Sequence, residues 1–242
     1  MLQKSILEKI IPSPIKTILR PLRNRMLKKN VEELAFWKSR LAIDNGVFKN
    51  YHYEKIMLGM AEEQNDDFFK NKIIADFGCG PRGSLVWVKD ATMRIGIDVL
   101  ADRYADEFTE NAIAHDMVYL KSTEKVIPLP SNFIDVLFTV NAIDHVNNFA
   151  LMCAEIVRVL KPGGYFIGSF NLEEPATPCE PQQLNERIIK ENLLNKLTIM
   201  SYRVSKKGPK DDMYAPFFNN TLSYQTGEEG VLWVKAQKPK NE

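Results

Sequence analysis

The stretch that decides the fold is Ile73-Ile74-Ala75-Asp76-Phe77-Gly78-Cys79-Gly80-Pro81-Arg82-Gly83. It begins as a short apolar run and ends as a glycine-rich turn. This order is typical of a buried parallel strand that runs into a nucleotide- or nucleoside-binding loop at the head of a helix. Glycines allow the backbone to approach a ligand where a Cβ atom would collide. We therefore expect a strand over 73–77 and a binding loop directly after it.

Downstream of this stretch, apolar runs of strand length alternate with segments of helical periodicity. Strands are predicted for 73–77, 94–98, 112–115, 134–140, 165–170, 197–204 and 231–236. A helix is predicted from Phe149 to Leu160, with Asn147 or Asn148 as its cap and Lys161-Pro162-Gly163-Gly164 at its end. Such alternation predicts an open, mostly parallel α/β sheet whose ligand site lies beyond the carboxyl ends of the strands.

The composition suits one globular domain with an appendage. The 242 residues are 45% hydrophobic and 26% charged, and the net charge is only +1, so we expect no nucleic-acid partner. Charge is unevenly spread, because residues 1–30 carry eight basic residues and one acidic residue. We therefore divide the chain into a basic arm over 1–30 and a main domain over 31–242, whose cofactor-binding half is 72–170.

The basic arm has two interpretations. Apolar residues recur near helical spacing in two pieces, which we expect to be broken at Pro12, Pro14 and Pro21. A basic amphipathic segment of this kind can rest on an anionic membrane surface, which would place the protein at the inner face of the membrane. Alternatively, it is a helix that packs on the domain or on a second subunit of an oligomer.

The cysteines point to a reducing compartment. Cys79, Cys153 and Cys179 are few and odd in number, and no CxxC pair or His/Cys cluster suggests a metal site. No apolar run approaches the roughly 20 residues that a membrane span needs. We therefore expect a cytoplasmic protein without a bound metal.

Two kinds of nucleotide ligand compete for the glycine loop. Asp98, at the end of the second predicted strand, suits the ribose of either a dinucleotide or S-adenosylmethionine. Asp76 discriminates between them, because it lies two residues before Gly78, where a dinucleotide loop normally keeps the strand apolar. A carboxylate at that point can remain close to the cationic end of a bound amino acid.

Five landmarks then occur in order, namely Ile74–Gly80, Asp98, Asp116, Asp135 and Leu160–Gly164. Together they resemble the motifs of class I S-adenosylmethionine-dependent methyltransferases over residues 72–170. The resemblance implies a Rossmann-like, mostly parallel seven-stranded sheet with helices on both faces, an antiparallel last strand and an N-terminal helical extension. Pro81-Arg82-Gly83 departs from the commoner continuation of the loop.

The resemblance also implies roles for single residues. Gly78, Cys79 and Gly80 would hold the methionine part of the cofactor against the backbone, with Asp76 behind them. Asp98 would accept hydrogen bonds from the ribose hydroxyls. Val99, Asp116 and Met117 would contact the adenine. Asn141 and Ala142 would flank the sulfonium.

Chemistry at the acceptor should fall to residues after the fourth strand. Pro128-Leu129-Pro130 and Asp144-His145-Val146 resemble the small-molecule branch of the family. His145 is the candidate general base for a hydroxyl acceptor, and Asp144 would orient it or act in its place. The alternative is that His145 only packs the start of the helix. Loops over 171–182, 51–53 and 206–220 are expected to recognise the acceptor.

We therefore expect an S-adenosylmethionine-dependent methyltransferase that methylates an oxygen of a small molecule or glycan. The stretch Glu33-Leu34-Ala35-Phe36-Trp37 resembles methyltransferases of bacterial polysaccharide pathways. Two alternatives stay open, an NAD(P)-dependent oxidoreductase and a non-catalytic relative that binds the cofactor or a partner protein.

Overall fold

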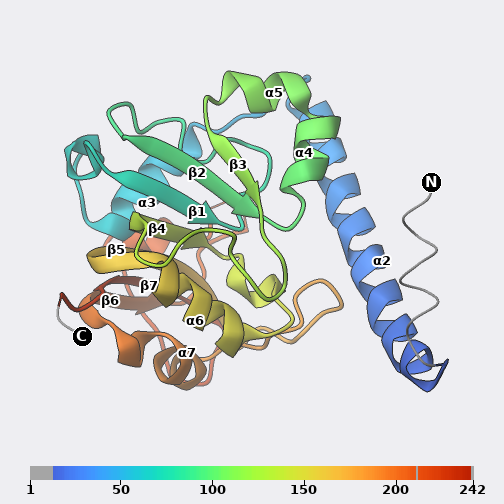
Figure 1. Cartoon of the computed structure of the whole chain (residues 1–242). Coiled ribbons are helices and arrows are strands. Elements are labelled where there is room, and N and C mark those ends of the chain that lie inside the picture. Colours follow the sequence, from blue (N-terminus) through green and yellow to red (C-terminus); the bar gives the residue numbers. More distant parts are fainter. Residues whose placement is uncertain (1–12, 211, 241–242) are drawn as a thin grey trace.

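The computed structural model describes residues 13–210 and 212–240, with side chains described from residue 28 onward. Its centre is one seven-stranded sheet of order β3-β2-β1-β4-β5-β7-β6 (Figure 1). The strands are β1 Ile73–Phe77, β2 Met93–Asp98, β3 Val118–Lys121, β4 Ile134–Val140, β5 Leu160–Leu172, β6 Thr198–Ser205 and β7 Gly230–Gln237. The first five pair in parallel, whereas β7 runs antiparallel to β5 and β6. The predicted sheet is therefore confirmed.

Strand β1 lies at the point where the order of the sheet reverses. The chain passes from β1 to β2 on one side and later returns to β4 on the other, with Ala75 opposite Ile95 and Leu137. Because these strands are parallel, their carboxyl ends at Phe77, Asp98 and Val140 meet at one edge. A crevice at such a switch point is the usual ligand site of this architecture.

Helices cover both faces of the sheet, because alternate residues of each strand point to opposite sides. On one face, Ala75 and Phe77 pack in the same apolar cluster as α6 Phe149–Val159 and α7 Glu186–Asn192, near η3 Leu194–Lys196. On the other face, Ile74 packs in a cluster with α3 His52–Ala61, η1 Asp66–Phe69 and α8 Ala215–Phe218. The central strands are thus buried on both faces.

The long helix α2, Ser13–Ile43, runs beside the sheet next to α4, Ala101–Glu107 (Figure 1). Its Leu34 is buried in a cluster with Tyr104 of α4, and Lys38 forms an ion pair with Glu107 at 2.6 Å. The break predicted at Pro21 is wrong, because α2 continues through it and tolerates the missing backbone donor there.

The predicted arm is therefore only partly described. Residues 1–12 lie outside the described residues, and α2 crosses the proposed boundary after residue 30. The division into an arm and a domain stays a prediction. Across the described part of the chain, no helix combines the length and the apolar character that crossing a bilayer requires.

The predicted third strand is wrong. Residues 112–115 fall at the end of helix α5, Thr109–Ala114, and β3 begins only at Val118. Val118 and Leu120 pair with Ile95 and Ile97 of β2. The physical reason is that Val118-Tyr119-Leu120 is the segment with β-branched and aromatic character, whereas the alanines before it favour a helix.

No helix follows the glycine loop. Residues 78–92 form turns before β2 begins, so the expected helix head beside the loop is also wrong. Pro81 lacks a backbone donor, and Gly83 has φ +74°, a left-handed conformation that interrupts a helix. The loop therefore offers its own backbone, without a helix N-terminus, to the edge of the sheet where β1 ends.

Candidate active site

A cavity of about 510 Å³ lies at the carboxyl ends of β1, β2 and β4. Helix α2 closes one side of it. The lining residues that sequence reasoning predicted are Gly78, Cys79, Asp98, Val99, Asn141, Ala142 and His145. Those contributed by α2 are Lys29, Glu32, Glu33, Phe36 and Trp37, which the sequence patterns did not assign to a site. Seven of the predicted residues therefore surround one hollow.

The glycine loop is shaped for close approach by a ligand or by a neighbouring element. Gly78 has φ +75°, and a Cβ atom there would lie 2.2 Å from the Cβ atom of Ala142. Gly80 has φ +56°, and its Cβ would lie 2.7 Å from the ring of Trp37. No larger residue fits at either position without strain. Gly78 and Cys79 line the cavity, whereas Gly80 lies against Trp37 and is not part of its wall. The contact of the three residues with the methionine part of a cofactor stays a prediction.

Asp98 is held in place by the backbone. Its Oδ2 accepts a hydrogen bond from the amide of Gly80 at 3.1 Å, and its Oδ1 accepts one from the amide of Leu100 at 2.9 Å. A carboxylate oxygen accepts more than one hydrogen bond, so both oxygens retain capacity for a pair of ribose hydroxyls. Burial raises the pKa of Asp98 to about 6, and it stays mainly ionised at neutral pH.

Asp76 lies behind the glycine loop rather than in the cavity wall. Its Oδ2 accepts a hydrogen bond from the hydroxyl of Ser84, and its buried Oδ1 has no partner among the described residues. Burial raises the pKa of Asp76 to about 7. A buried carboxylate oxygen without a donor fits a site that receives an ammonium or bound water.

Asp116 and Met117 do not join the site. Both precede β3, at the opposite edge of the sheet from the cavity, and the side chain of Asp116 is 91% exposed and paired with Arg94 at 2.6 Å. The error follows from the misplaced third strand. Ser122 and Glu124, which follow the true β3, line the cavity instead, and the buried Ser122 hydroxyl has no partner among the described residues.

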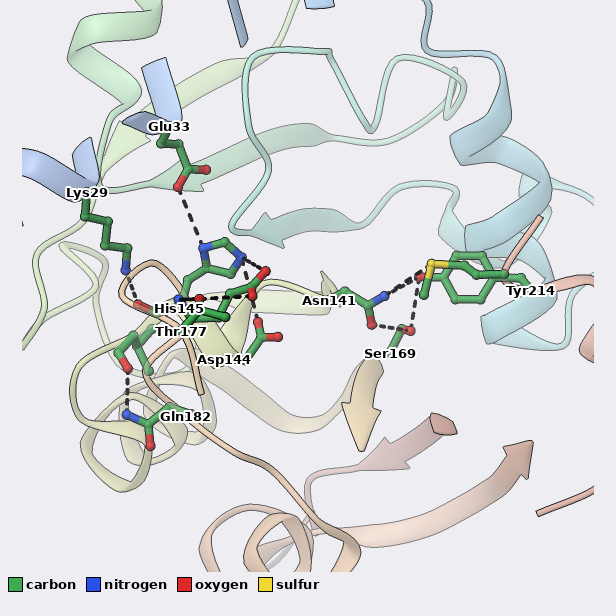
Figure 2. A network of polar contacts seen from close by, with 12 residues as sticks. Lys29, Glu33, Asn141, Asp144, His145, Ser169, Thr177, Gln182 and Tyr214 are labelled. Atoms are coloured by element: carbon green, nitrogen blue, oxygen red, sulfur yellow. Dashed lines mark hydrogen bonds and ion pairs between the residues drawn. The ribbon is translucent and has the colours of Figure 1, made fainter. Parts of the chain in front are cut away.

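His145 lies at the end of η2, Ile143–His145, and its ring is surrounded by carboxylates (Figure 2). Its Nδ1 is 3.7 Å from Glu33 of α2, and its Nε2 is 3.6 Å from Glu180 and 4.0 Å from Asp144. Burial alone would lower the pKa of His145, but Glu33 and Asp144 outweigh it and the net pKa is raised.

Asp144 is positioned behind the histidine. Its side chain is almost fully buried, and burial raises its pKa above the usual range. Asp144 is not part of the cavity wall, and its Oδ1 lies 4.0 Å from Nε2 of His145. Of the two residues predicted for catalysis, His145 reaches the cavity and Asp144 supports it.

A second polar group fixes Asn141 on the other side of the expected methyl position (Figure 2). The amide of Asn141 donates to the hydroxyl of Tyr214 at 2.9 Å and accepts from the hydroxyl of Ser169 at 2.8 Å. Asn141 itself has φ +46°, an uncommon conformation for a residue with a side chain. These bonds hold the end of β4 in a defined shape beside the cavity.

The three loops predicted to recognise an acceptor contribute unequally. Cys179 and Glu180 of the 171–182 loop line the cavity, and so does Tyr53, whereas the side chain of Tyr51 is 77% exposed. The 206–220 segment contains α8, whose Phe217 stacks on Trp233 with ring centroids 4.1 Å apart. Tyr214 and Phe217 of that segment are buried in the core, and Tyr214 is also its contact with Asn141. Within the described ranges, no cluster of three or more His, Cys, Asp or Glu residues is placed to hold a metal ion.

Comparison with known proteins places this site in context. Residues 75–168 match the family described as "Methyltransferase domain". A curated relative is the sterol 24-C-methyltransferase of Aspergillus fumigatus, 26% identical over 129 residues, which are 50% of this chain and 31% of that protein. The chain thus spans about a third of the length of this relative.

Solved structures share the fold. One is a chain of the complex that contains the Haloferax volcanii Trm112 methyltransferase activator, with TM-score 0.59, 16% identity and coverage of 87% of this chain and 97% of that chain. Another is an S-adenosylmethionine-dependent methyltransferase from Mesorhizobium loti, with TM-score 0.51, 16% identity and coverage of 70% and 92%. The fold is therefore a Rossmann-like methyltransferase fold. The family match supports a class I S-adenosylmethionine-dependent methyltransferase with S-adenosylmethionine as its cofactor.

Proposed function

We propose that this chain transfers a methyl group from S-adenosylmethionine to a hydroxyl group of a small molecule or glycan. The observation that carries the proposal is the position of His145, whose ring lines the same cavity as the glycine loop and Asp98. When bound, S-adenosylmethionine supplies an activated methyl group. The chain's own task is then to place the acceptor and to remove its proton.

The proposed roles follow the cavity wall. The backbone of Gly78–Gly80 and the carboxylate of Asp98 would bind the cofactor, with Val99 and Ser122 beside its adenine. Asn141 and Ala142 would border the reacting centre. Nε2 of His145 would take the proton of the acceptor, and Asp144 would stabilise the imidazolium that forms.

The test is an acceptor screen with isotopically labelled S-adenosylmethionine, using hydroxylated sugars and small phenols as probes. His145→Ala should lower turnover on the best acceptor by roughly 10²- to 10⁴-fold, the range that a general base supplies. Its affinity for S-adenosylhomocysteine should change little. Unchanged turnover would remove His145 from the mechanism.

Binding of a nicotinamide cofactor is tested in the same protein, because Asp98 alone would also suit the ribose of NAD. Calorimetry with S-adenosylhomocysteine and with NADH separates the two ligands. We expect binding of S-adenosylhomocysteine only, and exclusive binding of NADH would replace the proposed activity by that of an oxidoreductase. Binding without turnover on any acceptor would instead favour a non-catalytic relative.

The cellular setting is also a proposal. A role in a polysaccharide pathway agrees with the resemblance of the 33–37 stretch and with a hydroxylated acceptor. A cytoplasmic protein that touches the inner face of the membrane through residues 1–30 agrees with the eight basic residues in that segment.

A further inference from the structure

Helix α2 reaches the side of the cavity that holds His145 through three side chains, those of Lys29, Glu32 and Glu33. The ammonium of Lys29 donates a hydrogen bond to the main-chain carbonyl of His145. Glu32 accepts a weak hydrogen bond from Cys179 at 3.4 Å, and Glu33 faces the ring of His145. A helix that is distant in sequence therefore holds both the main chain and the side chain of the candidate base.

The two ring nitrogens of His145 have different surroundings (Figure 2). Nδ1 faces only Glu33 among the described carboxylates, at 3.7 Å. Nε2 faces Glu180, at 3.6 Å, and Asp144, at 4.0 Å. The tautomer of a neutral imidazole is set by the hydrogen bond that one nitrogen makes, which leaves the other nitrogen as the base.

We propose that Glu33 of α2 is a positioning residue for His145: its carboxylate holds the proton on Nδ1 and so leaves Nε2 to take the proton of the acceptor. The inference rests on the base role proposed for His145 and adds the residue that prepares it. It also makes α2 a part of the active site rather than a cover outside it.

The charges around the ring favour this assignment over the neighbouring acids. Burial tends to raise the pKa of Glu33, but His145 and Lys29 outweigh it, so the pKa of Glu33 is lowered and the side chain is ionised at neutral pH. Burial raises the pKa of Asp144. Glu180 lies on a loop with 42% of its side chain exposed, where solvent weakens its hold on the ring.

Every group that faces the ring enters its titration. These groups are Glu33 and Lys29 of α2, Asp144 of η2, Glu180 of the 171–182 loop and Asp98 at the end of β2. Lys29 opposes protonation of the imidazole, whereas the carboxylates favour it. Removal of the Glu33 charge should therefore make His145 easier to deprotonate, even though it would leave the ring less well oriented.

Nuclear magnetic resonance can follow this histidine directly, because the chain contains only His52, His115 and His145. The ring signals of the full chain bound to S-adenosylhomocysteine would be titrated and assigned with His145→Ala. We expect the neutral wild-type ring to carry its proton on Nδ1. Glu33→Gln should move the titration midpoint to lower pH, and Glu33→Leu should shift the ring away from the Nδ1–H tautomer.

Glu32→Gln is the matched control. It removes the same charge from the neighbouring position of α2, where the side chain contacts Cys179 instead of the ring of His145. Its titration midpoint for His145 should lie closer to the wild-type midpoint than that of Glu33→Gln. An Nε2–H tautomer in the wild type would overturn the proposal. Equal midpoints in the wild type and Glu33→Gln would overturn it as well.

Kinetics separates this inference from the proposed function. On an acceptor found in the screen, Glu33→Gln should lower kcat by about 10-fold, which is a part of what a general base supplies. In the profile of kcat against pH, the midpoint of the rise that accompanies deprotonation of His145 should move to lower pH. Glu33→Asp should recover part of the rate. If the protein shows the predicted tautomer but methylates no acceptor, the proposed function alone is contradicted. If it transfers methyl groups but Glu33→Gln leaves the midpoint of the pH profile unchanged, the role of Glu33 alone is contradicted.

Discussion

At the scale of a single residue, Asp98 is the proposed link between the fold and the cofactor, because it lines the cavity at the end of β2. It ends β2, and two backbone amides fix its carboxylate, that of Gly80 on the loop and that of Leu100 after the strand. Its position in the sequence was enough to predict its place in the cavity, because the end of a parallel strand determines where its last side chain lies.

Asp98→Asn should weaken binding of S-adenosylhomocysteine. Hydrogen bonds to a charged group contribute about 1.5–3 kcal/mol, so the dissociation constant should rise roughly 10- to 100-fold. Because burial raises the pKa of Asp98 to about 6, wild-type affinity should also fall as the pH drops through 6 and the carboxylate is protonated. Calorimetry from pH 5 to pH 8 measures both effects.

Asp90 is the matched control for the loss of the Asp98 charge. It is exposed, pairs with Lys70 and precedes β2, at the end of the sheet opposite the cavity. Asp90→Asn should bind like the wild type at every pH. Equal affinities for Asp98→Asn and the wild type would place the ribose elsewhere.

Asp76 should make the stability of the ligand-free protein depend on pH. Its folded pKa of about 7 lies above the ordinary value of about 3.9, so the folded state binds more protons than the unfolded state between these values. The free energy of unfolding should therefore fall as the pH rises through this window. Urea titrations at pH 5 and pH 8 measure the fall in the free energy of unfolding, which should be smaller in Asp76→Asn than in the wild type. An identical fall in both proteins would show that the pKa of Asp76 is not raised in the folded state.

At the scale of elements, the strands were more predictable than their connections. The β4 run Ile134–Val140 is apolar except for Asp135 and Thr139, and its predicted bounds agree with the structure. The third strand was misplaced because Val118-Tyr119-Leu120 is too short to stand out, and that error carried Asp116 and Met117 with it. The wall formed by α2 could not be predicted, because helical periodicity shows which residues share a face but not what that face covers.

Trp37 should report ligand binding at α2. It is the tryptophan that lines the cavity, whereas Trp87 and Trp233 pack in the core on the α3 side of the sheet. Addition of S-adenosylhomocysteine should change the intrinsic fluorescence, and Trp37→Phe should abolish most of that change. Trp87→Phe is the matched control and should retain it. A full response in Trp37→Phe would mean that the ligand does not reach α2.

At the scale of the whole molecule, the sheet order and the charge distribution carry different information. The alternation of strands and helices predicted an open, mostly parallel sheet with its ligand site beyond the carboxyl ends of the strands, and the observed order β3-β2-β1-β4-β5-β7-β6 places a crevice there. The cluster of Glu33, His145 and Glu180 was not predictable, because these residues come from separate parts of the chain and meet only in the folded structure.

The basic N-terminal segment should bind anionic lipid if the membrane proposal holds. Neutralising Lys4 and Lys9 leaves the cavity residues of α2 intact and should remove about 1 kcal/mol of membrane affinity for each charge near the surface. Flotation with vesicles containing phosphatidylserine, at low and high salt, measures this. Equal flotation of the wild type and Lys4→Gln/Lys9→Gln at both salt concentrations would contradict the proposal.

The central claim is that S-adenosylmethionine binds across the ends of β1 and β2, under α2. A crystal structure of the protein with S-adenosylhomocysteine tests it most directly. We predict electron density for the ribose hydroxyls at the carboxylate of Asp98 and for the sulfur beside Asn141 and Ala142. Density for the ligand outside this cavity, or a ribose that makes no contact with the carboxylate of Asp98, would contradict the account.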